Sequence, residues 1–323
     1  MPAVALALTL LVASSALALQ LPGRTSVRNG PVRLVTLNGA SFAFTVARTA
    51  TDCDHVELWN TDTKGFWRFG RPGACGDRTS TGAGISSIGV SGNRALWIRF
   101  GGGNTREWQL MTATTTQRTP RQLRFVAQDV DLPSPMVIGD STGNLGIPYA
   151  VGREVVLLGA NGVAVFRTTE PARVTLITAG RGPAGAVVAG LLETGEIDLL
   201  RTDGSHAWTL GVQPGAVSAI ALAPTGLVVQ RANEVQIRTP AGLSLAVSLP
   251  AGARMIDFSQ GRILYRRNNE IHALQASTGT DTLLLQGGAG ATAISATADT
   301  HGFGWAQDRK VNFACGSCVS FAR

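Results

Sequence analysis

The stretch "EIDLLRTDGSHAWTL", residues 196–210, has the pattern of a β-hairpin. Apolar residues gather on both sides of Asp203-Gly204, and an Asp-Gly pair is a preferred turn between antiparallel strands. Elsewhere, short alternating or apolar runs are interrupted by Gly, Asn, Asp and Pro, and helical spacing of apolar residues is nearly absent. These features predict an all-β chain.

The same strand-turn-strand unit recurs along the chain, which is typical of a repeat fold. The other hairpins are expected at 56–69, 107–125, 155–167, 235–249, 271–285 and 311–322. Two more apolar runs precede each hairpin, so each period predicts four strands. The first strands begin near Val32, Ser86, Pro135, Arg173, Val217, Ala253 and Ala291. This spacing predicts a β-propeller of seven four-stranded blades, although six or eight blades stay possible because the third period is irregular.

The segments "LLRTDGSHAWTL" (199–210) and "ALQASTGTDTLLL" (273–285) resemble the blades of the β-propeller superfamily, in particular its quinoprotein-like and WD-repeat-like members. The resemblance covers residues 32–323. It implies that Trp208 docks one blade against the next. The other blades lack this Trp and the chain has no Trp-Asp dipeptide, so the resemblance carries no cofactor or activity with it.

The N-terminus predicts export. Residues 1–18 form an uncharged apolar run that ends in Ala16-Leu17-Ala18, which fits a signal-peptide cleavage site. The usual basic start is missing, which leaves open an upstream start or an uncleaved anchor. We expect a signal peptide at 1–18, a linker at 19–31 and a propeller at 32–323, in a protein that is secreted or lies on the exterior of a bacterial cell envelope. No membrane span is expected after cleavage.

The net charge of +7 raises the question of nucleic-acid binding. Only Lys64 and Lys310 among the 28 basic residues are Lys, and the Arg residues are scattered singly. Such scatter is typical of a GC-rich genome and argues against a polyanion-binding surface.

The four cysteines predict disulfides in an exported chain. Cys53 and Cys75 fall in two loops that share one face of a propeller, so we expect them to pair. Cys315 and Cys318 flank Gly316-Ser317, where the other blades have a turn, and we expect them to pair within the last hairpin. Redox-active thiols and a metal site are the alternatives. The dispersed His residues lack ligand spacing, so no metal site is expected.

Gly180, Gly182 and Gly185 form a G-x-G-x-x-G motif that resembles a dinucleotide-binding fingerprint. This flavin or dinucleotide alternative requires a helix after Gly185. The segment that would form it carries an internal Gly and two adjacent Val, and it falls in frame with the repeats. We therefore expect no cofactor.

Function is expected on the face that carries the enlarged loops of blades one and two, because loops on a rigid scaffold usually carry function. The candidate binding residues are Arg48, Asp52, Asp54, Arg71, Asp77, Arg78, Asn104, Arg106, Asp129 and Asp131. The sequence favours a monomeric binding or interaction module, with an extracellular or cell-surface protein or glycan as its partner. An extracellular hydrolase or lyase that uses paired channel carboxylates is the alternative, and no catalytic residues can be assigned.

Overall fold

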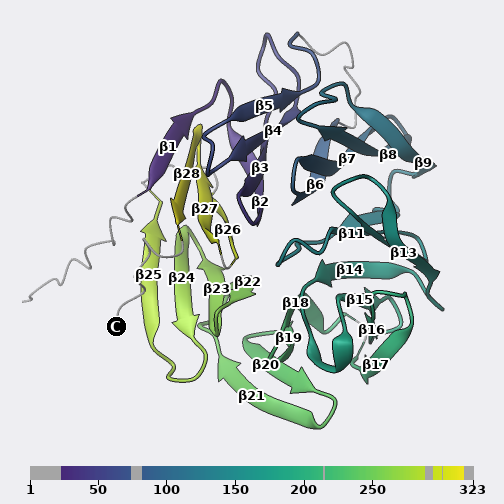
Figure 1. The fold of residues 1–323 in the computed structure, drawn as a ribbon, viewed down its shortest axis with the longest axis vertical. Helices are drawn as coiled ribbons and strands as arrows, with labels where there is room; N and C mark the ends of the chain where they lie inside the picture. Colours follow the sequence, from purple (N-terminus) through teal and green to yellow (C-terminus); the bar gives the residue numbers. More distant parts are fainter. Residues whose placement is uncertain (1–22, 74–81, 214, 288–293, 300, 316–323) are drawn as a thin grey trace, which may run out of the picture.

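The computed structural model describes residues 23–73, 82–213, 215–287, 294–299 and 301–315. These residues form 28 β-strands and one short 3-10 turn, η1 (Pro183–Gly185). The strands make seven four-stranded antiparallel sheets that surround a central axis as blades (Figure 1). The predicted all-β, seven-bladed propeller is confirmed. No helix in the described part of the chain is long and apolar enough to span a membrane.

The first three blades follow the chain from the innermost to the outermost strand. Blade one comprises β2 (Val32–Asn38), β3 (Ser41–Val46), β4 (His55–Asn60) and β5 (Phe66–Phe69). Blade two comprises β6 (Gly84–Ser91), β7 (Arg94–Gly102), β8 (Thr105–Thr114) and β9 (Arg121–Asp129). Blade three comprises β10 (Met136–Ile138), β11 (Ile147–Val151), β12 (Glu154–Leu158) and β13 (Ala164–Thr169).

Blades four to six repeat this order. Blade four comprises β14 (Val174–Ala179), β15 (Val188–Leu192), β16 (Glu196–Leu200) and β17 (His206–Gly211). Blade five comprises β18 (Val217–Ala223), β19 (Gly226–Arg231), β20 (Glu234–Thr239) and β21 (Gly242–Ser248). Blade six comprises β22 (Arg254–Ser259), β23 (Arg262–Arg267), β24 (Glu270–Gln275) and β25 (Asp281–Gln286). The hairpins expected in the first six blades are therefore confirmed.

Blade seven is built from both ends of the chain. Its inner strands are β26 (Ile294–Ala298), β27 (Gly302–Gln307) and β28 (Lys310–Cys315), and its outermost strand is β1 (Arg24–Val27). Strands β1 and β28 are antiparallel, with Arg24 opposite Phe313 and Val27 opposite Lys310. Figure 1 shows purple β1 beside yellow β28.

This closure bears on two sequence-based predictions. The second strand of the expected hairpin at 311–322 lies outside the described residues, which end at Cys315, and the outer edge of β28 pairs with β1 from Lys310 to Phe313. The expected linker at 19–31 is wrong for Arg24–Val27, whose backbone pairs with blade seven. Sequence periodicity cannot identify such a strand, since β1 is short, largely exposed and distant from its partner in the sequence.

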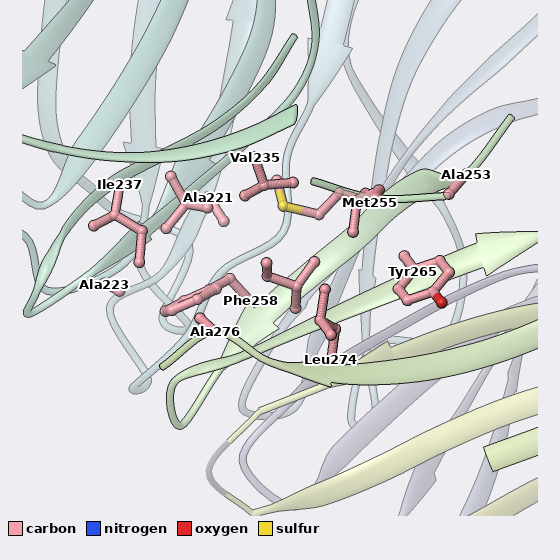
Figure 2. Close-up of a cluster of buried hydrophobic side chains, with 13 residues drawn as sticks. Ala221, Ala223, Val235, Ile237, Ala253, Met255, Phe258, Tyr265, Leu274 and Ala276 are labelled. Carbon is pink, nitrogen blue, oxygen red and sulfur yellow. The ribbon is translucent and has the colours of Figure 1, made fainter. Parts of the chain in front are cut away.

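The hydrophobic core lies between the blades. Each of seven clusters of buried apolar side chains combines residues from two neighbouring blades. In the cluster between blades five and six, Ile237 and Val235 face Met255 and Phe258 (Figure 2). The burial of both faces explains why a strand such as β15 is apolar throughout, whereas the outer strand β21 alternates between exposed and half-buried residues.

The glycine motif at Gly180–Gly185 lies between two strands of blade four. After Gly182 the chain makes the η1 turn and enters β15, which pairs with β14 and β16. The helix that a dinucleotide site requires is replaced by a strand, so the dinucleotide-binding interpretation is wrong. A Cβ at Gly180 would lie 2.5 Å from the carbonyl oxygen of Leu222, which shows that glycine here permits close packing of blades four and five.

Candidate functional site

The two long loops of blade one meet on one face of the propeller. One loop links β3 to β4 and the other links β5 to β6, and the backbone N–H of Cys53 donates to the carbonyl oxygen of Gly73 at 3.1 Å. The expectation that these loops share a face is thereby confirmed. The second loop is described only up to Gly73 and again from Gly82, so Cys75, Asp77 and Arg78 lie outside the described residues.

Asp52 and Arg68 fasten these loops to the blade. Both terminal nitrogens of Arg68, on β5, donate to the Asp52 carboxylate, one of them at 2.7 Å to Oδ1. The backbone N–H of Gly73 donates to the same Oδ1 at 3.2 Å. The hydrogen bonds from Arg68 lower the pKa of Asp52 to about 2, so the carboxylate is charged throughout the neutral range. We call this unit the loop clamp.

A buried polar network continues inward from the loop clamp. His55 donates through Nδ1 to the carbonyl oxygen of Cys53 at 2.8 Å, and its Nε2 lies 3.2 Å from both Glu57 Oε1 and Arg68 Nη1. Arg28, just after β1, donates to Glu57 at 2.7 Å. Burial alone would raise the pKa of Glu57, but the hydrogen bonds from His55 and Arg28 outweigh burial and lower it. The network therefore joins the loop clamp to the segment that closes the ring.

The remaining blade-one candidates are held in different ways. Asp54 accepts the backbone N–H of Arg48 at 2.8 Å, and its carboxylate lies 3.6 Å from Arg48 Nε. Arg48 also reaches the carbonyl oxygen of Ala83 at 3.5 Å, while 41% of its side chain stays exposed. Arg71 is exposed. Asp52 and Asp54 are thus each paired with an Arg, whereas the side chain of Arg71 and the exposed part of Arg48 face solvent.

The blade-two candidates lie where β7 meets β8 and β9 ends. The carbonyl oxygen of Asn104 accepts the N–H of Val130 at 3.0 Å, and Asp129 Oδ1 accepts the N–H of Asp131 at 3.1 Å. The guanidinium of Arg106 lies over the rings of Phe100 and Trp108, 5.1 and 5.9 Å from their centres. The Asp129 side chain thus stabilises the turn that contains Asp131, and cation–π contacts position Arg106.

A cavity of about 310 Å³ lies at the junction of these two groups. Ala83 contributes from blade one and Arg99, Phe100, Glu107 and Gln109 from β7 and β8. Since Arg48 contacts Ala83 and Arg106 contacts Phe100, the two groups of candidates border one recess.

Sequence reasoning missed several residues of this surface. Arg68, His55 and Glu57 stand on strands, where the sequence pattern indicates packing within the blade, yet they hold the loops in place. A charged residue flanked by aromatics, as in "FWRF" (66–69), is the signal that could have identified Arg68. Arg99 and Glu107 line the recess but fall in predicted strands, where no loop pattern singles them out.

A second cavity, of about 290 Å³, occupies the central channel and is lined by the inner strands of all seven blades. Two carboxylates reach it, Asp140 and Asp257. Burial, followed by the charge of Asp140, raises the pKa of Asp257 to about 8. Desolvation inside the channel raises the pKa of Asp140 as well, although its side chain is open to the channel and a 3.0 Å hydrogen bond from Thr36 opposes the shift. The two acids therefore resist ionising together.

Residues 139–146, here called the channel loop, border this channel, and Gly139 and Asp140 line its cavity. The N–H of Thr142 donates to the carbonyl oxygen of Ala179 in blade four at 3.1 Å. On the other side, the N–H of Asn144 donates to Asn38 Oδ1 in blade one at 3.1 Å. The channel loop is thus held between blades one and four.

The tryptophans serve packing. Trp59, Trp97, Trp108 and Trp305 are buried, and Trp67 and Trp208 are half-buried. Trp208 packs against the cluster between blades four and five, as the blade resemblance implied. The tryptophans consequently offer no exposed platform for stacking sugars.

Cys53 and Cys315, the two cysteines in the described part of the chain, are both disulfide-bonded. Cys315 ends β28. Cys75 and Cys318 lie outside the described residues, so the pairing of Cys53 with Cys75 and of Cys315 with Cys318 stays a prediction.

No family model and no curated protein matches this chain. Its fold is similar to solved structures at low sequence identity. A chain from the crystal structure of the mitotic checkpoint complex matches with a TM-score of 0.57 and 14% identity, over 98% of this chain and 98% of that chain. Raptor from Chaetomium thermophilum matches with a TM-score of 0.53 and 13% identity, over 91% of this chain and 29% of Raptor. Sqt1 from Saccharomyces cerevisiae matches with a TM-score of 0.49 and 10% identity, over 90% and 97% of the two chains.

Proposed function

We propose that this chain, a seven-bladed β-propeller structurally similar to WD40 proteins, is a protein-interaction module that binds through the loop face of blades one and two. WD40-like propellers typically serve as protein-interaction modules, and the solved structures with a similar fold include a chain of a multiprotein complex, the mitotic checkpoint complex. The proposed binding face comprises Arg48, Arg71, Arg99, Asn104 and Arg106; Arg99 lines the 310 Å³ recess, and Arg48 and Arg106 contact its lining residues Ala83 and Phe100.

The loop clamp is the observation that carries this proposal. Asp52 binds both terminal nitrogens of Arg68 and the backbone of Gly73, so the two loops are held together before any partner arrives. A preorganised surface loses less conformational entropy on binding than a mobile one. The structure thus contains a device whose evident effect is to fix the loops that present Arg48 and Arg71.

The charges of this face favour an acidic partner segment. Arg71 is exposed, and Arg48 is partly exposed although it also pairs with Asp54, whereas Asp52 is engaged by Arg68. Arginine forms bidentate hydrogen bonds with carboxylates, which suits recognition of Asp or Glu side chains. Export to the cell exterior is part of the proposal and rests on the apolar run at residues 1–18.

The test is capture of partners from the exported proteins of the source organism, followed by titration calorimetry with each purified partner. The double variant Arg48→Glu, Arg71→Glu should bind at least about tenfold more weakly, since hydrogen bonds to charged groups contribute about 1.5–3 kcal/mol each. The control is Arg181→Glu. Arg181 is exposed and lies in the connection that leads into β15, the second strand of its blade, whereas the proposed binding loops follow the second or fourth strands of blades one and two, at the other end of the blades. Equal binding by all three proteins would refute the proposed face.

A second candidate function is hydrolysis or lyase chemistry in the channel. The observation that favours it is that Asp140 and Asp257 both line the channel, and that burial and the charge of Asp140 raise the pKa of Asp257 to about 8, so Asp257 keeps its proton near neutral pH. Asp257→Asn would abolish such an activity against extracellular polysaccharides or peptides. Unchanged turnover in that variant would exclude the channel pair as acid and base.

A further inference from the structure

Glu170, Asp198 and His206 converge at the junction of blades three and four. Glu170 directly follows β13, Asp198 lies in β16 and His206 begins β17. One potential ligand atom from each residue lies within 4.8 Å of the others. His206 is 3.8 Å from each carboxylate, through Nε2 to Glu170 Oε2 and through Nδ1 to Asp198 Oδ1.

A β-bulge directs the blade-four side chains toward blade three. Asp198 stands opposite Thr209 and Leu200 opposite His206, with a register shift between these pairs. Without the shift, His206 and Thr209 would point to opposite faces because they are three residues apart. The bulge places both on the face of Asp198, and bulges often re-aim side chains in this way next to sites. Thr209 donates its hydroxyl hydrogen to Asp198 Oδ1 and so fixes that carboxylate.

Glu170 is buried with its charge unmatched. Its side chain is 1% exposed, and among the residues that the structure describes no N–H or hydroxyl group donates to either carboxylate oxygen. Its backbone is held tightly, since its N–H donates to the carbonyl oxygen of Arg153 at 2.9 Å and its own carbonyl oxygen accepts from Arg153 Nε at 2.8 Å. A buried carboxylate without a donor is costly and calls for a proton or a cation.

The distances between His206 and the two carboxylates are too long for hydrogen bonds and suit a bound cation better. At 3.8 Å, both imidazole nitrogens lie beyond hydrogen-bond length from the carboxylates. An imidazole binds an ion through one nitrogen, and ligand atoms that bind Zn²⁺ at about 2.0–2.2 Å are at most about 4.4 Å apart. His206 Nε2 and Glu170 Oε2 meet this limit, and the three residues together offer one ligand atom each within 4.8 Å of one another. Half of the His206 side chain is exposed, which leaves an approach for the ion and for a water ligand.

We propose that Glu170, Asp198 and His206 form a divalent transition-metal site, of the open Zn²⁺ type with one imidazole and two carboxylate ligands. Thr209 orients the Asp198 carboxylate through its hydrogen bond, as hydrogen-bond donors commonly orient metal ligands. The ion links the end of β13 to the β16–β17 hairpin and so joins blade three to blade four.

The test is calorimetric titration of untagged, chelator-treated protein with ZnCl₂, together with the melting temperature with and without the metal. The native chain should bind one strong equivalent and gain thermal stability. His206→Gln and Glu170→Gln should each weaken that binding at least about 100-fold and lose the stabilisation. Glu170→Gln should remain folded without metal, because it removes the unmatched charge.

The matched control is His272→Gln. His272 also lies between two carboxylates, but at 3.2 Å from Glu270 and 3.4 Å from Asp281, close enough for direct contact, and Tyr265 donates to Asp281 as well. Zn²⁺ binding should be unchanged in this variant. Absence of a strong equivalent in the native chain, or binding equally weakened by His272→Gln, would overturn the site and leave a shared proton between Glu170 and Asp198.

Discussion

Thr36 in blade one donates its hydroxyl hydrogen to Oδ1 of Asp140 in the channel loop at 3.0 Å, although the two residues are 104 positions apart. Asp140 is tied to blade four as well, because its carbonyl oxygen accepts the N–H of Ala179 at 2.9 Å. One residue thus connects blades one, three and four at the channel. Gly139 permits this approach, since a Cβ there would lie 1.7 Å from the carbonyl oxygen of Ile177.

The paired channel acids predict a loss of stability as the pH rises. The pKa of Asp257 is raised in the folded state to about 8, so folding favours its protonated form. Its contribution to stability is full below the unfolded pKa near 4 and is lost as the pH rises through 8. Asp140→Asn removes the neighbouring charge and keeps the acceptor for Thr36. We expect the variant to be more stable than the native chain by about 1–2 kcal/mol at pH 8, from the usual size of a one-unit pKa shift.

Urea unfolding at pH 4, 6 and 8 checks this expectation. At pH 4 both proteins should have similar free energies of unfolding, because the carboxyls are largely protonated in each. An equally steep decline with pH in Asp140→Asn would show that the two acids do not interact.

The loop clamp predicts the opposite pH dependence. The pKa of Asp52 is lowered to about 2 by Arg68, so its contribution is present above the unfolded pKa near 4 and is lost as the pH falls toward 2. Arg68→Met should lower the free energy of unfolding by about 1–3 kcal/mol at pH 7, the usual loss for a hydrogen bond to a charged group. The difference from the native chain should shrink between pH 4 and pH 2. Arg71→Met, at an exposed position, is the control and should change little.

The cysteines predict two cystines, Cys53–Cys75 and Cys315–Cys318. Peptide mapping of the unreduced protein by mass spectrometry should find both linked pairs and no free thiol. The double substitution Cys53→Ser, Cys75→Ser should lower the free energy of unfolding by about 3 kcal/mol, as expected for a closed loop of roughly 20 residues. A cross-linked peptide that joins Cys53 to Cys318 would contradict the predicted pairing.

Because β1 closes the ring, we expect the stability of an N-terminally truncated chain to depend on whether β1 is kept. A chain that starts at Gly23 keeps β1 and should behave as the native protein, whereas a chain that starts at Val32 exposes the edge of β28. We expect the shorter chain to melt at a lower temperature and to self-associate, because an unpaired strand edge is a template for association. Size-exclusion chromatography and thermal unfolding of the two truncations compare them directly. Equal behaviour would mean that β1 contributes little.

Local sequence patterns were sufficient for most of the fold. The predicted starts at Val32 and Val217 coincide with β2 and β18, because repeated apolar runs report blades that bury both faces. The pattern failed at blade seven, where the partner of β28 comes from residues 24–27 and no local signal marks a pairing across the whole chain.

The candidate surface was predictable only in outline. Loop length and polarity pointed to Arg48 and Asp52, yet the partner of Asp52 is Arg68 on a strand. The site at Glu170 was missed entirely, because His206 and Asp198 are brought together with Glu170 by a bulge and a blade junction. Dispersed His residues say nothing about metal ligands when the fold itself supplies the spacing.

The pairing of β1 with β28 sets an order of events during synthesis. Among the described strands, residues 24–27 emerge first, but their only partner strand in the described chain, Lys310–Cys315, emerges last. Until then the early blades have an open flank, and Val32, Phe42 and Phe44 lack the side chains of blade seven that cover them in the finished ring. The nascent chain must therefore carry an uncovered apolar surface through almost the whole of translation, and the ring closes in one late step.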